Sequence, residues 1–344
     1  MYEPEINEVF QEILGSRTTM REEDLRFTNV VRGIANTQQI PLPEISTDDM
    51  TFVFFTRPMM NLTNGNLYRE RSMVKYMDQD TNDVNSYIRR LLDPLTDKSF
   101  KEKHTLLRSD SPFIHVFSNT LLSMSGWPDQ VNESWISPDG QNKIKWGYSV
   151  GTNKVHREFD LDVKFHNLSE DVITRILDAW TTYQSSVSKG IFWPTNIAMM
   201  NRYIDYQTGI YVIVTNKNYK IKKIAKTIGH FIANPKGAFF DFDRTQYKTY
   251  KIPTINTRMK CFNAWYNDPI LLLEFNRTVM AMNPSIRAMV KEGSKDMVEV
   301  PRNLRIPFMF DGVPFIDLKY NTLEWLVSKD QYAVLKKQEG ENNE

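Results

Sequence analysis

The stretch of sequence that decides the fold runs from Val155 to His166 and reads VHREFDLDVKFH. Its side chains alternate between two faces without a break. One face carries Val155, Arg157, Phe159, Leu161, Val163 and Phe165, and the other carries His156, Glu158, Asp160, Asp162, Lys164 and His166. A period of two residues is typical of a β-strand with one buried and one polar face. We therefore predict a strand whose polar face is a ladder of charge.

A second alternating stretch precedes this strand. Its apolar members are Ile144, Trp146, Tyr148 and Val150, and the turn-forming residues Gly151-Thr152-Asn153 follow them. We therefore predict one long hairpin over residues 144–166. A hairpin of this length is too long to serve only as one wall of a small core, so we expect it to pair with another molecule or to present its polar face to one.

Length and composition indicate a globular protein. A chain of 344 residues can bury roughly three quarters of its unfolded surface. The net charge of +1 gives no overall attraction to nucleic acid or to an anionic membrane. No apolar run approaches the length of a membrane span, and the polar N-terminus is unlike a secretory signal. The single cysteine, Cys261, excludes an internal disulfide and is interpreted as a buried thiol in a protein made in the cytoplasm.

Several further elements are predicted in the first half of the chain. We expect a short helix over residues 5–15 and then an extended arm to residue 50. Thr51 to Phe55 (TFVFF) has the composition of a strand. One helix is expected to start at Asn82 and to end before Asp93-Pro94, and a second to start at Ser111-Pro112 and run towards Gly126. Residues 127–140 are rich in turn signals and are interpreted as a loop.

The second half of the chain begins with a helix that follows the long hairpin. Asn167 and Glu170 form a capping-box pattern at its start, and Gly190 marks its end. Residues 210–214 predict a buried strand, with residues 219–224 as its hairpin partner. Residues 254–285 mix strand and helix signals. Asp311-Gly312 predicts a turn between strands at 305–310 and 313–316.

The polar face of the 155–166 strand is the one constellation that could bind a metal, through His156, Glu158, Asp160, Asp162 and His166. Side chains two positions apart on a strand are separated by about 7 Å. That spacing favours a row of solvated or partner-facing charges over a coordination sphere. We expect no metal and no cofactor.

Two other charged segments allow alternative interpretations. Asp241 and Asp243, with His230 upstream, could perform acid–base chemistry or hold Mg²⁺, but a strand end with two exposed acids explains them more simply. The lysines of residues 219–226 could contact phosphates or protect a sheet edge. They could instead pair across a subunit boundary with the acidic ladder.

The usual catalytic signatures are absent from the sequence. There is no Gly-rich phosphate loop, no His-Glu-x-x-His zinc helix and no Cys-x-x-Cys pair. The tryptophans are scattered and do not define a carbohydrate-binding platform. This absence counts against a nucleotidase, a metalloprotease and a zinc module.

The order of the central elements resembles a known family. The acidic strand leads into a helix centred on residues 179–183 (AWTTY), and KGIFWP at 189–194 and GHFIANP at 229–235 follow. This order resembles the tube-type domain of contractile-tailed bacteriophages, which is found in tail tube subunits and in baseplate proteins that initiate the tube. The resemblance covers about residues 144–250. It implies an α+β fold, with an antiparallel β-sandwich or barrel-like tube-type domain, a long hairpin, a flanking helix and helical insertions.

The resemblance also implies a function in the virion. Subunits of that family form rings through which DNA passes without sequence-specific binding, and they catalyse no reaction. The partners expected are therefore further copies of the chain and other virion proteins, with no insertion into a membrane. Five charged residues are candidates for a channel or an interface: Glu158, Asp160, Asp162, Lys220 and Lys222. Five others are candidates for an oligomerisation hairpin: Trp146, Tyr148, Phe159, Leu161 and Val163.

Four segments are expected along the chain. They are an N-terminal helix and arm (1–50), a strand with a helical insertion (51–140), a tube-like β domain with a helix at 168–188 (141–300), and a C-terminal hairpin and tail (301–344). The extra segments suggest a specialised ring at the baseplate or neck, with the TFVFF-TRP segment and the terminal straps contacting other virion proteins. Two alternatives remain: a baseplate glycan hydrolase that uses Glu158 and Asp241, and an adaptor that binds only proteins.

Overall fold

The computed structural model describes residues 49–78, 80–129, 132–139, 145–152, 158–168, 170–237, 254–300, 312–333 and 336. Its helices are α3 (Asn64–Leu67), the 3₁₀ helix η1 (Arg71–Met77), α4 (Val84–Leu92), α5 (Pro94–Ser99), α6 (His115–Thr120), α7 (Val172–Ser188), α8 (Asn196–Asn201), α9 (Ile270–Met282) and α10 (Pro284–Glu292). Its strands are β1 (Met50–Phe55), β2 (Leu121–Ser125), β3 (Asn132–Ile136), β4 (Gly147–Thr152), β5 (Phe159–His166), β6 (Thr208–Thr215), β7 (Ile221–Phe231), β8 (Thr254–Tyr266), β9 (Met297–Glu299), β10 (Val313–Asp317) and β11 (Thr322–Ser328).

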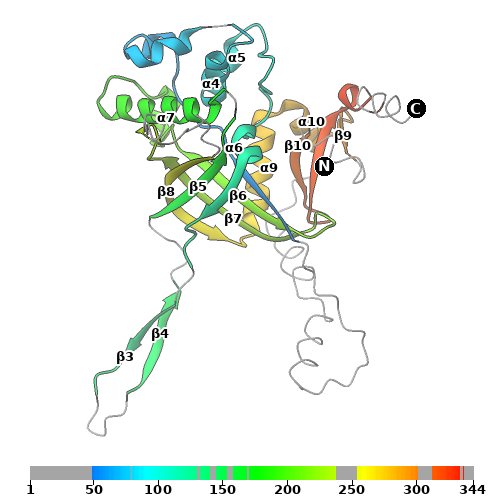
Figure 1. The fold of residues 1–344 in the computed structure, drawn as a ribbon. Coiled ribbons are helices and arrows are strands. Elements are labelled where there is room, and N and C mark those ends of the chain that lie inside the picture. The colour runs from blue at the N-terminus through cyan, green and yellow to red at the C-terminus, as the bar shows by residue number, and fades with distance from the viewer. Residues whose placement is uncertain are drawn as a thin grey trace, which may run out of the picture. The chain divides into compact units, whose positions relative to one another are not determined.

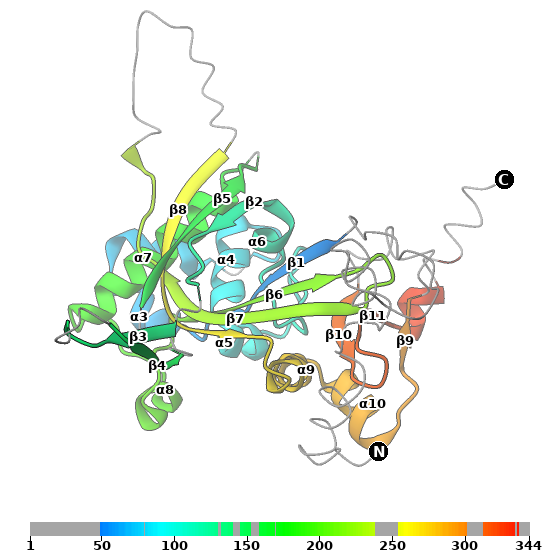
Figure 2. The same cartoon turned by 90° about the horizontal axis from the view of Figure 1, so that it is seen from below.

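The largest sheet has six strands in the order β1-β6-β7-β8-β5-β2. It is antiparallel and curls into a half-barrel, and Figure 2 shows this curvature from below. The mixture of helices with an antiparallel, barrel-like sheet confirms the predicted α+β class. The chain forms two compact units, which are described separately. The sheet unit comprises residues 53–211 and 225–266, and the C-terminal unit comprises the described parts of 1–52, 212–224 and 267–344. The division into four segments stays a prediction.

The alternation predicted for the acidic strand is confirmed over residues 159–166. Leu161, Val163 and Phe165 are buried, whereas the side chains between them are exposed. β5 lies between β2 and β8 and pairs antiparallel with both. Its apolar face can therefore pack on the core while its polar face meets solvent.

The predicted hairpin over residues 144–166 is wrong in its pairing. β4 pairs with β3, from Asn132↔Thr152 to Ile136↔Gly147, and forms a separate two-stranded sheet (Figure 1). The segment 127–140, which was interpreted as a loop, therefore supplies the partner strand. We call this two-stranded hairpin the arm. The neighbours of β5 are instead strands far away in sequence.

Aromatic rings fill the core of the sheet unit. Phe117 of α6 contacts Phe165 of β5 at 4.9 Å and Phe231 of β7 at 5.2 Å between ring centroids. Trp180 of α7 packs on Phe231 at 5.3 Å, and Phe55 of β1 packs on Phe117 at 5.6 Å. All five side chains are fully buried. Helices α6 and α7 thus cover the apolar face of the sheet.

The helix predicted over 168–188 begins later than expected, because α7 starts at Val172. Asp171 is the N-cap residue in a left-handed conformation, and its carboxylate accepts a hydrogen bond from Asn167 instead of capping the helix. The C-terminal end is as predicted. Gly190 has a φ of 70°, which suits the residue after a helix C-cap.

Two predictions in the helical insertion need correction. The cap of α4 is Asp83 and not Asn82, since the Asp83 carboxylate accepts from the amides of Asn85 and Ser86. The helix predicted from Ser111 to Gly126 is interrupted at both ends. Ile114 N–H donates to the Phe55 carbonyl, so this segment is extended, and residues 121–125 pair with β5 as β2.

The C-terminal unit places α9 and α10 with the three-stranded sheet β10-β11-β9. Asn276 of α9 is buried and holds edge strand β10 by two hydrogen bonds. Its Nδ2 donates to the Ile316 carbonyl at 2.7 Å, and the Ile316 amide donates to its Oδ1 at 2.9 Å. The strand predicted at 313–316 is present, and β11 is its described partner.

Several predictions fall outside the described residues. These are the N-terminal helix and arm, the strand at 305–310, and the acidic pair Asp241 and Asp243. The predicted strands at 51–55, 210–214 and 219–224 correspond to β1, β6 and the start of β7. The ambiguous stretch 254–285 divides into β8 and α9. Among the described residues, no helix is long and apolar enough to span a bilayer.

Candidate functional site

The outer face of the sheet around β5 is a ladder of opposite charges. Asp160 and Asp162 lie opposite Lys260 and Arg258 of β8 in the strand register. Arg258 Nε lies 3.0 Å from Asp162 Oδ1, and Lys260 Nζ lies 3.2 Å from Asp160 Oδ1. Lys260 Nζ also lies 3.7 Å from Glu158 Oε2. Opposite charges on facing residues stabilise an antiparallel strand pair, so these contacts fix the charges in register.

We call this surface the charged face. Its charged members are Glu158, Asp160, Asp162, Lys164, Arg258 and Lys260, and the exposed His166 lies at its end. The charged face carries three carboxylates and three cations, so its formal charge is zero. Hydrogen bonds to the carboxylates raise the pKa of Arg258 and of Lys260, and both stay charged. Strand β8 thus adds a basic row beside the acidic residues of β5, and the channel or interface role of Glu158, Asp160 and Asp162 stays a prediction.

A shallow depression crosses the charged face. Its polar lining comes from β2, β5 and β8 and consists of Ser123, Ser125, Asp162, Lys164, Asn256 and Arg258. The depression is too open to enclose a small ligand. In the part of the chain that the structure describes, no group of three or more His, Cys, Asp or Glu side chains could hold a metal ion.

His230 and Cys261 lie near this surface, but both side chains pack against neighbouring residues of the chain. His230 is half-buried between Tyr206 and Phe262, and burial lowers the pKa of its imidazole. Cys261 is fully buried, as predicted, and burial raises the pKa of its thiol to about 12. Such a thiol is protonated and unreactive at neutral pH.

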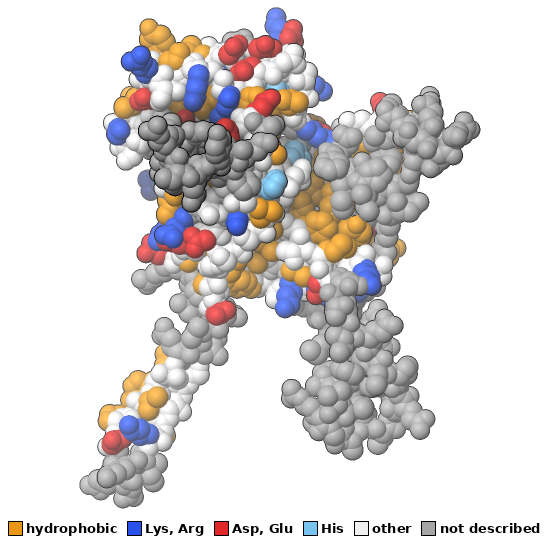
Figure 3. All heavy atoms as spheres, in the orientation of Figure 1, with side chains coloured by type: hydrophobic (Ala, Val, Ile, Leu, Met, Phe, Trp, Pro, Cys, Tyr) orange, Lys and Arg blue, Asp and Glu red, His pale blue; other side chains and the backbone are white. Residues whose placement is uncertain are grey.

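The arm presents an aromatic cluster to solvent. Trp135 lies opposite Tyr148 in the register, and Trp146 is next to Tyr148 on the same face. The ring of Trp135 is 5.5 Å from both other rings between centroids. The three side chains are 42%, 62% and 55% exposed for Trp135, Trp146 and Tyr148, and Figure 3 shows hydrophobic atoms along the arm. A two-stranded hairpin is marginally stable alone, so this cluster is a strong candidate for an interface.

The other face of the arm carries the exposed Ile136 together with the small residues Ser134, Gly147 and Ser149. Ser134 faces Ser149, and Gly147 faces Ile136. Large apolar residues therefore alternate with glycine and serine along β4. At the base of the arm, Trp127 packs on Phe159 and Tyr266 at 6.2 and 6.0 Å, and Tyr266 Oη donates to the Pro128 carbonyl at 2.6 Å. The segment that leads into the arm is thus anchored on the sheet.

The structure separates the residues predicted for an oligomerisation hairpin. Trp146 and Tyr148 lie on the exposed aromatic face of the arm. Leu161 and Val163 are buried in the core and have no surface for a partner, and Phe159 is half-buried beside Trp127. Of this set, only Trp146 and Tyr148 are available for contact.

The predicted basic residues Lys220 and Lys222 belong to the C-terminal unit. Lys220 forms a β-bridge with Thr322, and Lys222 forms an ion pair with Asp49. Lys226 of the same run lies in the sheet unit, where its ammonium is buried over the rings of Tyr211 and Trp265. Its cation is therefore unavailable to a phosphate.

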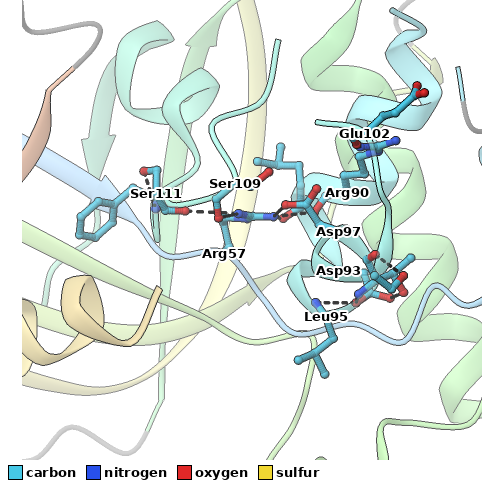
Figure 4. Close-up of polar contacts among 12 residues, drawn as sticks. Arg57, Arg90, Asp93, Leu95, Asp97, Glu102, Ser109 and Ser111 are labelled. Atoms are coloured by element: carbon cyan, nitrogen blue, oxygen red, sulfur yellow. Dashed lines mark hydrogen bonds and ion pairs between the residues drawn. The ribbon is translucent and has the colours of Figure 1, made fainter. Parts of the chain in front are cut away.

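A buried cluster around Arg57 was missed by sequence reasoning (Figure 4). The Arg57 guanidinium donates to the carbonyls of Leu91 at 3.0 Å and Arg90 at 2.6 Å, and it forms an ion pair with Asp97 at 3.4 Å. It also donates to the Ser109 and Ser111 carbonyls. Burial lowers the pKa of Arg57.

The Arg57 cluster corrects the role expected for the TFVFF-TRP segment. Phe54, Phe55 and Arg57 are buried within the chain and do not offer a contact to other proteins. The only feature of the sequence that could have indicated this role was the position of a charged residue between a buried strand and Pro58. Arg57 instead connects the end of β1 to helices α4 and α5 through its hydrogen bonds and its ion pair.

Comparison with known proteins gives the family. The family described as "Putative phage tail tube protein" matches residues 7–340, which is nearly the whole chain. This chain belongs to the phage tail tube protein family. A comparison with curated proteins gave no match.

Membership of the tail tube family settles the class of function. The tail tube protein is a structural component of the phage virion, and the family is not one of enzymes. The hydrolase alternative, which needed Glu158 as a catalytic carboxylate, is therefore set aside; Glu158 is exposed beside Lys260.

Proposed function

We propose that copies of this tail tube protein assemble into a ring whose inner wall is the charged face and through which DNA passes. The observation that carries this proposal is the half-barrel itself. Its six strands curl without closing, and α6 and α7 occupy its apolar face. The polar face remains for water, and a ring of such sheets would enclose a hydrated lumen.

The balance of charge on this face supports a passage for DNA. Binding to the phosphate backbone depends on cations that replace its counterions. On the charged face, Arg258 and Lys260 are already engaged by Asp162, Asp160 and Glu158. DNA would therefore meet fixed and mutually compensated charges, and would be neither held at the wall nor strongly repelled from it.

The arm supports assembly through its exposed aromatic face. Trp135, Trp146 and Tyr148 form a contiguous apolar surface on a hairpin that lacks a core of its own. Aromatic side chains of this kind are enriched in protein interfaces. We therefore assign the arm, and not the predicted 144–166 hairpin, as the element that joins copies.

We further infer that the ring is a specialised one at the baseplate or neck. The helical insertion α3–α5 is fastened to β1 by the Arg57 cluster, and the C-terminal unit adds a second sheet and two helices. These parts provide additional rigid surfaces for other virion proteins, beyond what a repeating tube subunit needs.

Mass photometry and negative-stain electron microscopy of the purified full chain test this proposal. We expect closed rings whose formation depends on concentration. The double variant Trp146→Ser/Tyr148→Ser should stay folded but remain monomeric, whereas Ser134→Ala on the other face of the arm should assemble normally. A chain that stays monomeric at high concentration, or that forms only closed dimers, would contradict the proposal.

A further inference from the structure

A second exposed apolar surface lies around α8. We call it the α8 patch; its members are Met59, Trp193, Ile197, Met200, Tyr203 and Ile204. Met200 is 83% exposed and Trp193 is 58% exposed. Figure 2 shows α8 at the margin of the sheet unit. Large apolar side chains exposed close together in sequence, as at 193–204, usually mark an interaction site.

The backbone beneath the α8 patch is held in place. The Trp193 carbonyl accepts from Nδ2 of Asn61 at 2.8 Å and of Asn66 at 2.9 Å, and its amide donates to Asn66 Oδ1 at 3.2 Å. The Thr195 hydroxyl caps α8 by accepting from the Ala198 amide at 3.2 Å. The exposed side chains are therefore displayed on a preorganised base, which lowers the entropic cost of binding.

The patch is formed by residues from two distant segments. Tyr203 Oη contacts Met59 Sδ at 3.9 Å, which joins the segment that follows β1 to the segment that follows α8. Methionine and aromatic side chains together make a surface that adapts to the shape of a partner. The chemistry of the patch therefore fits an apolar, aromatic occupant.

The arm has the chemistry and the size to be that occupant. At roughly 150–250 Å² for each aromatic side chain, the exposed parts of Trp135, Trp146 and Tyr148, together with Val150, present about 400–500 Å² of apolar surface. The α8 patch presents at least as much. Joining the two would bury on the order of 1,000 Å² in total, which reaches the size of a specific interface.

Both surfaces occur once in every chain, so a contact between them has a defined direction. We propose that the aromatic face of the arm of one copy docks on the α8 patch of the next copy. Such a contact is heterologous, and a heterologous contact closes into a ring when its rotation permits. The inference rests on the proposed ring and names the surface that receives the arm.

Cysteine cross-linking between two different variants tests the contact directly. Trp146→Cys in one preparation and Met200→Cys in another are mixed and treated with a short bis-maleimide. The natural Cys261 is fully buried and does not interfere. We expect a cross-linked dimer from the mixture. The control pair replaces Trp146→Cys with Ser134→Cys on the opposite face of the arm and should cross-link at least about tenfold less, as expected for a side chain that points away.

Charge substitution gives a second readout. Met200→Asp should raise the concentration needed for assembly by at least about thirtyfold, the effect of spoiling one hot-spot position. Tyr320→Asp is the matched control, because Tyr320 is a 59% exposed aromatic residue outside both surfaces. It should leave assembly unchanged.

The outcomes separate the two proposals. Rings that form normally in Met200→Asp, with no cross-link to Trp146→Cys, would overturn the contact while leaving the ring intact. A cross-link found only when both cysteines are in the same chain would show that the arm folds on its own patch and would also overturn it. Absence of any assembly by the unmodified chain would instead refute the proposed ring.

Discussion

Asp162 of β5 and Arg258 of β8 are cross-strand partners whose carboxylate and guanidinium lie 3.0 Å apart on the solvent-facing side of the sheet. They are separated by 96 positions in sequence. An acidic row that looks uncompensated along one strand is thus neutralised by its neighbour. The charge that DNA would meet on this face is a property of two paired strands, and the first prediction follows from it.

Removing the three acids should make the charged face bind DNA. The triple variant Glu158→Gln/Asp160→Asn/Asp162→Asn removes the carboxylates that contact Arg258 and Lys260 and leaves this face with a surplus of positive charge. We expect salt-sensitive binding of duplex DNA, with a slope of log K against log salt of roughly −0.9 for each phosphate contacted. Fluorescence anisotropy measures it. Unfolding should hardly change, because exposed ion pairs contribute little to stability.

The matched control removes the bases instead. Arg258→Gln/Lys260→Gln leaves an acidic surplus and should show no DNA binding at any salt concentration. Equal binding by the two variants would mean that the charged face does not determine contact with DNA.

Arg57 should be essential for the stability of the sheet unit. Arg57→Met leaves the buried Asp97 carboxylate without its cation and several carbonyls without a donor. Breaking a buried pair on one side costs about 3–5 kcal/mol of unfolding free energy. Arg57→Lys should rescue little, since an ammonium cannot reproduce the planar fork of donors. Chemical denaturation measures the free energy of unfolding of both variants. An effect no larger than that of exposed Arg277→Ala would contradict the role of Arg57.

Asp178 should give the sheet unit an acid-sensitive contribution to stability. Partial burial acts to raise the pKa of Asp178, but hydrogen bonds from Lys236 and Lys75 outweigh it and hold the pKa below its ordinary value. Because the pKa of Asp178 is lower in the folded state, its carboxylate stabilises the fold at pH values above the unfolded pKa of about 3.9. This stabilisation is lost as the pH falls through the folded pKa. Asp178→Asn should therefore cost about 1 kcal/mol at pH 7 and nothing near pH 2.

Urea denaturation at several pH values checks this behaviour. Glu170→Gln, an exposed acid that precedes the same helix, serves as the control and should show no such dependence. A difference between wild type and Asp178→Asn that is independent of pH would contradict the assignment.

Asn276 should hold the edge of the C-terminal sheet locally. Asn276→Ala removes both hydrogen bonds to the backbone of Ile316, and each buried group left unpaired costs about 1–3 kcal/mol. Hydrogen exchange of the Ile316 amide should accelerate at least about tenfold, while Arg277→Ala, at the exposed neighbouring position, leaves it unchanged. Unchanged exchange in Asn276→Ala would show that β10 is held by packing alone.

The sequence predicted local patterns well and distant partners poorly. The alternation of Leu161, Val163 and Phe165 follows from the geometry of a single strand, so β5 was found. Its neighbours β2 and β8 come from distant segments, and nothing in a period of two specifies them. Of the two strands of the arm, only β4 was predicted, because Trp146 and Tyr148 belong to a clear alternating pattern. Strand β3 was missed because it lies in a segment rich in turn signals.

The same limit explains the errors in the helical insertion. Ser111 and Pro112 have the composition of a helix start, but tertiary hydrogen bonds override it. Arg57 N–H donates to the Pro112 carbonyl, and Ile114 N–H donates to the Phe55 carbonyl, which keeps the segment extended. Arg57 itself could not be recognised, because its burial depends on carbonyls from two distant segments, the end of α4 and residues 109–111.

Cryo-electron microscopy of the assembled protein tests the central claim most directly. The account predicts a closed ring in which Asp160, Asp162, Arg258 and Lys260 of every copy line the inner wall, while α7 lies away from the lumen. A ring with α7 on the inner wall and the charged face outside, or an assembly without a central channel, would contradict it.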